Sequence, residues 1–332
     1  MLIYSSKLFF FCSLSSGVLL SISSDSWFGA WCGLELNLMS FIPFISLMKN
    51  NYTSEASLKY FLIQALGSAV IILGAVSILI LPLMKWVVAS SLMLKMGAAP
   101  LHFWFPSVMS GLNWLSCLVL MSIQKIAPLS LLSYMLSSLE SSYLIIIGII
   151  AGATVGSIGG LNQVFLRKIL AYSSINHMSW MLSCLWMSDS SWIMYFAFYV
   201  LISSTIVYLF YSQNMNHISH MAVFKWSSLS VVTWMSLLSL GGLPPFTGFV
   251  PKWFVLQEMM FLKMFIPSFF LLAGTLVSLY YYLRLIFLSM SVSVVTTKWS
   301  KEAFFLSKKM SFYVALSLMG LIMPSFFFLF FM

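Results

Sequence analysis

Long apolar runs follow one another along almost the whole chain, with short polar segments between them. A hydrocarbon core about 30 Å thick needs roughly 20 apolar residues for each helix that crosses it. The pattern therefore predicts an all-α polytopic membrane protein with about eleven transmembrane helices. The predicted helices lie at residues 3–22, 26–48, 55–81, 84–104, 112–137, 142–161, 166–187, 191–212, 226–259, 264–290 and 310–331.

The composition supports lipid as the solvent. Hydrophobic residues make up 61% of the 332 residues and charged residues only 7%, which is too little polar surface for a water-soluble protein of this size. The net charge of +9 does not indicate nucleic acid, because the basic residues occur singly and form no stripe with stacking aromatic residues. The four cysteines show no spacing typical of zinc, iron–sulfur or disulfide sites, so we expect no cofactor or metal on this chain.

The basic residues of the loops predict the orientation. Counted alternately, the loops on the side of the N-terminus hold most of them, and the opposite side has mainly Lys85 and Lys263. By the positive-inside rule the N-terminus faces the cytoplasm or matrix, and an odd number of helices takes the C-terminus across. The basic residues on the N-terminal side are Lys7, Lys49, Arg167, Lys168, Lys225, Lys298, Lys301, Lys308 and Lys309.

Ionisable residues inside the predicted helices are the main candidates for function. Glu35, Lys95, Lys125 and Lys252 fall well within predicted spans. A charge at the centre of a membrane helix costs roughly 2.5–3.5 kcal/mol, so these residues suggest a buried polar path for protons. His177 also lies in an apolar span, where a neutral, hydrogen-bonded histidine is as consistent with the sequence as a proton carrier.

Helix breakers stand beside two of the lysines. Lys95 is the first residue of KMGAAPLHFWFP, and Lys252 is the last residue of GGLPPFTGFVPK. Interrupted helices survive in a bilayer only where they face protein or water, and a matching pair in two halves points to a transport site. The interruptions fall in about the fourth and ninth helices, which predicts two repeats of five helices, the second inverted.

This interpretation divides the chain into three parts. Residues 1–137 form the first five-helix bundle, residues 142–290 form the second, inverted bundle, and residues 291–332 form a basic loop with a C-terminal transmembrane helix.

Six sequence blocks resemble a known family. They follow the family's order over nearly the whole chain and resemble the antiporter-like membrane subunits of mitochondrial NADH:ubiquinone oxidoreductase, respiratory complex I, in their shortened animal form. The blocks are GAWCGLELNLMSFIP, SEASLKYFL, KMGAAPLHFWFP, SIQKIAP, LAYSSINHMSW and GGLPPFTGFVPKW.

The resemblance implies a function. It implies proton translocation across the mitochondrial inner membrane, with Glu35 and the three buried lysines as the proton relay. His177 is a further relay candidate because it lies between lysine-bearing helices. It also implies a subunit of the H⁺-translocating NADH:ubiquinone reductase that has no redox centre of its own, since NAD, FMN, iron–sulfur clusters and ubiquinone are expected in partner subunits. The implied partners are other membrane-arm subunits and lipids, with the N-terminus in the matrix and the C-terminus in the intermembrane space.

Three other functions can be compared with proton translocation in complex I. A cation/proton antiporter without redox coupling would need a carboxylate cluster for its ion, and the predicted membrane interior offers too few carboxylates. A purely structural subunit would use the lysines only to hold helices together. A seven-helix receptor does not fit the number of predicted helices or the two interruptions.

Overall fold

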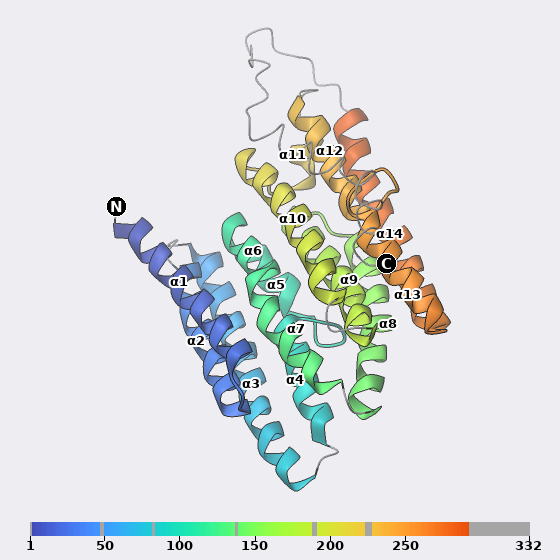
Figure 1. The fold of residues 1–332 in the computed structure, drawn as a ribbon. Coiled ribbons are helices and arrows are strands. Elements are labelled where there is room, and N and C mark those ends of the chain that lie inside the picture. Colours follow the sequence, from blue (N-terminus) through green and yellow to red (C-terminus); the bar gives the residue numbers. More distant parts are fainter. Residues whose placement is uncertain are drawn as a thin grey trace. The chain divides into compact units, whose positions relative to one another are not determined.

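The structure is a computed structural model that describes residues 2–46, 50–81, 84–136, 139–187, 191–222 and 228–291. Helices make up almost all of these residues (Figure 1). The chain divides into two compact units, Met1–Gly152 and Ala153–Met332. The predicted basic loop and final helix, together with the loop residues Lys49 and Lys225, lie outside the described residues.

The first unit begins with three long helices and continues with shorter ones. In Figure 1, α1, α2 and α3 lie side by side, and α3 packs in turn on α4 and α5. The boundary between the two units falls within α8. The helices are α1 (Leu2–Ser23), α2 (Trp27–Ser46), α3 (Asn51–Ile80), α4 (Lys85–Met96), α5 (Trp104–Gly111), α6 (Trp114–Met121), α7 (Ile123–Met135) and α8 (Leu139–Leu161).

The second unit is built around α9, which contacts α10, α13 and α14. Contacts of the preceding segment fix the position at which α9 begins. Phe165 forms an antiparallel bridge with His217, and Arg284 donates hydrogen bonds to the carbonyls of Leu161 and Gln163. The helices are α9 (Leu166–Met187), α10 (Ser191–Ser212), α11 (Ile218–Ala222), α12 (Ser228–Gly241), α13 (Phe249–Phe261) and α14 (Phe265–Ser291).

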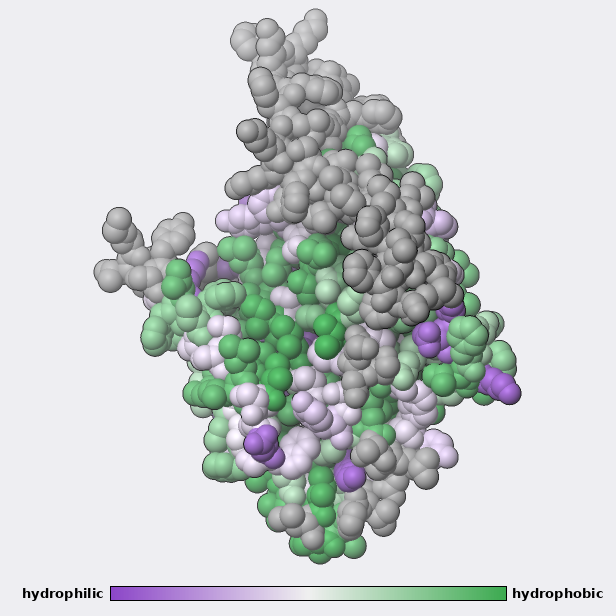
Figure 2. All heavy atoms as spheres, in the orientation of Figure 1, coloured by the Kyte–Doolittle hydropathy of each residue, from purple (hydrophilic) through white to green (hydrophobic). Residues whose placement is uncertain are grey.

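The described residues form an all-helical membrane protein. Seven of their helical stretches are long and apolar enough to cross a bilayer. Among the residues that Figure 2 colours by hydropathy, apolar ones cover most of the surface and strongly hydrophilic ones are few. Three other predicted spans fall within the described residues. Two of them, 84–104 and 226–259, contain the predicted interruptions, and the third is α9. α9 can be less apolar because 17 of its 22 residues are buried within the protein and do not meet lipid.

Candidate functional site

The first interruption follows Lys95 almost directly. α4 ends at Met96, Gly97 has a left-handed backbone with a φ of 70°, and helical structure resumes only at Trp104. Glycine suits this position because residues with a Cβ atom rarely adopt a positive φ. The structure therefore confirms the interruption predicted from the KMGAAP sequence and places Lys95 one residue before the end of α4.

Lys95 is buried against α3. Gly67 leaves room for its aliphatic stem, since a Cβ atom on Gly67 would lie 3.1 Å from Cγ of Lys95. Gln64, one turn earlier, donates its side-chain N–H to the Lys95 carbonyl at 3.1 Å. Glu35 on α2 interacts with Lys95 electrostatically, but within the described residues the two form no direct salt bridge. The predicted Glu35–Lys95 pair is therefore not in direct contact in the described structure, and its role stays a prediction.

Lys125 follows another interruption, which the sequence did not predict. The predicted span 112–137 consists of two helices, α6 and α7, which meet at Ser122, where φ is −110° and ψ is −85°. The Lys125 side chain is 1% exposed, and its Nζ atom lies 5.0 Å from the centre of the Phe105 ring. Phe105 also packs against Gly97, where a Cβ atom would lie 3.0 Å from that of Phe105. One aromatic ring therefore contacts both Lys125 and the end of α4.

A chain of three amide and phenol groups lies next to Lys125. Tyr60 on α3 donates its hydroxyl proton to Oε1 of Gln124 at 3.2 Å, and Nε2 of Gln124 donates to Oδ1 of Asn37 at 2.9 Å. The chain joins α2, α3 and α7, and Tyr60 interacts electrostatically with Glu35. Sequence reasoning missed all three residues. The available signal was position, since Gln124 precedes Lys125 and Asn37 follows Glu35 by two residues.

The second predicted interruption is present before Lys252. α12 ends at Gly241 and α13 begins at Phe249, so residues 242–248 are not helical, as Pro244 and Pro245 predict. Lys252, in the first turn of α13, donates from Nζ to the carbonyl of Gly241 at 2.9 Å and to that of Leu240 at 3.2 Å. The C-terminal end of α12 thus holds the amine, which is where a helix dipole favours a cation. The predicted polar path for protons at Lys252 stays a prediction.

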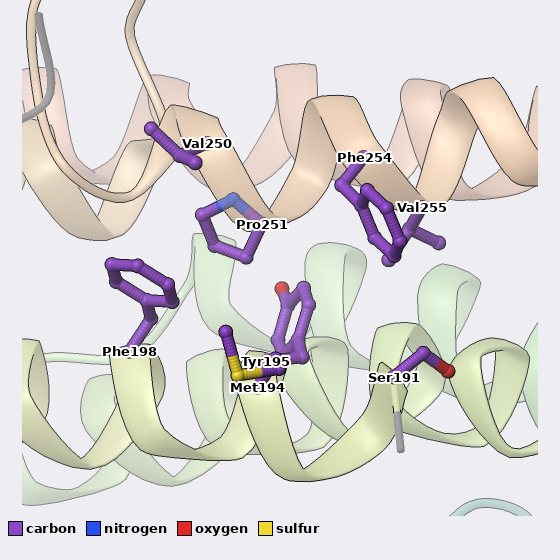
Figure 3. A pocket seen from close by; sticks show the side chains of 8 residues that line it. All are labelled: Ser191, Met194, Tyr195, Phe198, Val250, Pro251, Phe254 and Val255. Carbon is purple, nitrogen blue, oxygen red and sulfur yellow. The ribbon is translucent and has the colours of Figure 1, made fainter. Parts of the chain in front are cut away.

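His177 is buried on α9 and faces two tyrosines of α10. Its Nδ1 atom lies 2.9 Å from the hydroxyl oxygen of Tyr195, and its ring centre lies 5.1 Å from that of Tyr199. Tyr195 also lines a small cavity of about 10 Å³ between α10 and α13, in which Figure 3 shows it extending toward Pro251. Apolar side chains make up most of this lining, and the volume suits a single water, not a cofactor.

The structure groups the predicted residues by unit. Glu35, Lys95 and Lys125 belong to the first unit, and His177 and Lys252 belong to the second. Within the described parts of the chain, no three histidine, cysteine or acidic side chains gather as a metal site requires.

Comparison with known proteins gives consistent results. The sequence matches the family described as "NADH:quinone oxidoreductase/Mrp antiporter, TM" over residues 24–83 and 80–279. "NADH-ubiquinone oxidoreductase chain 2" of Locusta migratoria is 43% identical over 294 residues, which cover 85% of this chain and 85% of the relative. The protein of the same name in Anopheles gambiae is 40% identical over 333 residues, 95% of this chain and 96% of the relative. A chain of respiratory complex I from Thermus thermophilus has the same fold, with a TM-score of 0.79 and 21% identity over 96% of this chain and 78% of that chain.

Proposed function

Because the chain belongs to the family of NADH:quinone oxidoreductase and Mrp antiporter membrane subunits, we propose that its buried lysines carry protons across the membrane. The chain is an antiporter-like, proton-translocating membrane subunit of NADH:ubiquinone oxidoreductase, respiratory complex I. Electron transfer from NADH to ubiquinone takes place in other subunits, which hold the FMN and the iron–sulfur clusters, and it drives the proton movement here.

One observation carries the assignment of the route. Lys95, Lys125 and Lys252 are each at most 6% exposed, and each lies within about one helical turn of an interruption. An interrupted helix frees backbone groups that must be satisfied by protein or water, so it brings polar surroundings to an amine held away from lipid. Lysine suits a carrier that gains and loses a proton in every cycle, because arginine stays protonated. Lysines that served only to hold helices together would have no reason to lie beside helix interruptions.

The proposal gives each of these residues a separate role. Glu35 and Lys95 form a modulating pair, whose changing interaction shifts the charge state of Lys95 and moves protons onward. Lys125 is the central relay, His177 is a further relay, and Lys252 is the terminal carrier toward the opposite face. Proton transfer from Lys125 to Lys252 is part of this proposal.

The membrane arrangement completes the proposal. The chain crosses the mitochondrial inner membrane about eleven times, as two inverted five-helix repeats (residues 1–137 and 142–290) followed by a last helix. Its N-terminus lies in the matrix and its C-terminus in the intermembrane space. Lys7, Arg167 and Lys168 on the matrix side support this orientation. The remaining partners are the neighbouring membrane-arm subunits and lipid.

Replacement of Lys125 by methionine tests the route. Lys125→Met keeps the length and most of the volume of a side chain that is 1% exposed, and it removes the proton-carrying group. NADH-driven proton pumping by the assembled complex should fall severalfold, while native gels show that assembly is retained. Lys263→Met is the matched control, because Lys263 is exposed in the turn after α13. If Lys125→Met pumps as fast as Lys263→Met, then Lys125 is a structural residue and the proposed route is wrong.

A further inference from the structure

A group of buried hydroxyls in the second unit has no part in the route described so far. Three helices contribute to it. α9 provides Ser173 and Ser174, α10 provides Tyr199, and α14 provides Tyr282. These residues and the relay candidate His177 of α9 are all buried. On a helix, positions 173 and 174 share a face with position 177, because they precede it by four and three residues.

The two serines hold the two tyrosines next to each other. The hydroxyl of Tyr199 lies beside that of Ser174, and the hydroxyl of Tyr282 lies beside that of Ser173. Because these serines are consecutive, the hydroxyls of one tyrosine from α10 and one from α14 lie near adjacent positions of α9. The ring of His177 is 5.1 Å from that of Tyr199, centre to centre. His177, Tyr199 and Tyr282 therefore form one continuous group.

Tyr282 extends this group to the carbonyl that holds Lys252. Gly241 faces the Tyr282 ring, since a Cβ atom on Gly241 would lie 3.7 Å from Cδ2 of Tyr282. The Gly241 carbonyl accepts the 2.9 Å hydrogen bond from Nζ of Lys252. Gly241 therefore contacts the Tyr282 ring and, through its carbonyl, the Lys252 amine.

The Tyr282 hydroxyl has hydrogen-bonding capacity to spare. It is fully shielded from solvent, and its neighbours are the hydroxyls of Ser173 and Tyr281. A hydroxyl can donate one hydrogen bond and accept two, and ordered water is the usual way that buried polar groups complete such bonding. Phenylalanine would fill the same space without a polar atom to satisfy. The hydroxyl therefore calls for a role of its own.

We propose that Tyr282, together with Tyr199, passes protons between His177 and Lys252, with ordered water completing the contacts. In each transfer the phenol accepts a proton on its oxygen as its own O–H proton leaves to the next group, so one O–H bond forms as another breaks. No charge accumulates and no co-reactant is needed. The inference rests on the proposed role of Lys252 as a proton carrier and adds the residues that connect it to His177.

Three single variants and one double variant of the assembled complex provide the test. Tyr282→Phe removes only the hydroxyl, and Tyr280→Phe is its matched control, because Tyr280 lies on the same helix and is 62% exposed. Lys252→Met measures how much NADH-driven pumping depends on the proposed carrier. We expect Tyr282→Phe to lose the same share of the pumping rate as Lys252→Met and Tyr280→Phe to lose none. Since both residues serve one path, the double variant Tyr282→Phe/Lys252→Met should lose no more than Lys252→Met alone.

Each outcome has a distinct meaning. If Lys252→Met reduces pumping but Tyr282→Phe behaves like Tyr280→Phe, the tyrosine path is wrong and the lysine route stands. If the double variant loses clearly more than Lys252→Met, then Tyr282 acts outside that path and the inference is also overturned. Unchanged pumping in Lys252→Met refutes the route itself. If Tyr282→Phe fails to assemble, Tyr199→Phe interrupts the same path and carries the same expectation.

Discussion

Gly242 sets the position of the Lys252 amine, and adding one methyl group there should displace it. Gly242 has a φ of 79°, and a Cβ atom at this residue would lie 2.8 Å from both Cδ and Nζ of Lys252. The contact is with the flexible end of a side chain, so the amine can move away. Movement breaks at least one of its hydrogen bonds to the carbonyls of Leu240 and Gly241. Gly242→Ala should therefore misplace the amine and leave the fold intact.

The cost of Gly242→Ala can be worked from two contributions. A residue with a Cβ atom in the left-handed region costs about 1–2 kcal/mol, and a hydrogen bond to a charged group contributes about 1.5–3 kcal/mol. Strain and the loss of one such bond together destabilise the arrangement by about 2.5–5 kcal/mol. If the hydrogen-bond part of that energy, about 1.5–3 kcal/mol, falls on the protonated state of Lys252, NADH-driven pumping should drop by about tenfold or more, since each 1.4 kcal/mol is a factor of ten.

The neighbouring glycine supplies the control for this experiment. A Cβ atom on Gly241 would meet its nearest neighbours at 3.7 Å, an ordinary van der Waals contact, and Gly241 is the last residue of α12. Gly241→Ala adds the same methyl group without strain. Pumping by the assembled complex, followed with a pH-sensitive dye in sealed vesicles, should be impaired in Gly242→Ala and near normal in Gly241→Ala. Equal pumping by the two variants would refute the idea that the carbonyls of α12 position Lys252.

Two further variants test other contacts of the site. Gly248→Ala should prevent stable incorporation of the chain into the complex, as measured on native gels. A Cβ atom at this residue would lie 1.7 Å from the backbone oxygen of Ser239, which cannot move aside. Normal incorporation would mean that α13 can begin in another position. Phe105→Leu keeps an apolar side chain but removes the aromatic face under Lys125, an interaction of about 0.5–2 kcal/mol. Its pumping rate should fall severalfold relative to Phe103→Leu, whose side chain is 80% exposed, and equal rates for the two variants would show that the ring does not tune Lys125.

Much of the fold could be predicted from the sequence because lipid imposes simple rules on it. The length of apolar runs predicted the helices, and α9 and α10 have the predicted bounds of 166–187 and 191–212. Pro244 and Pro245 predicted the interruption before Lys252 because consecutive prolines remove backbone donors. These are local properties of the chain, and the structure reproduces them.

The parts that escaped prediction depend on contacts between helices. The interruption at Ser122 has no glycine or proline beside it, and the nearest helix breaker, Pro128, lies inside α7. The chain from Asn37 through Gln124 to Tyr60 joins three helices, and its residues lie 64 or more positions apart where they bond. Helical periodicity predicts which face a residue occupies but not which residue of another helix it meets. The roles of Glu35, the buried lysines and His177 stay predictions for the experiments above.

The burial of α9 has a consequence for how the protein is made. With 17 of its 22 residues covered by protein, α9 has almost no surface suited to lipid, and its Asn176 and His177 would be exposed to hydrocarbon if it entered the bilayer alone. Polar groups of this kind raise the cost of releasing a helix from the translocation machinery into lipid. Insertion of α9 is thus coupled to the arrival of α10, α13 and α14, which follow it in the chain and contact it in the folded unit. The second half of the protein must be integrated as a group, and synthesis that stops after α9 would leave a segment that the bilayer does not retain.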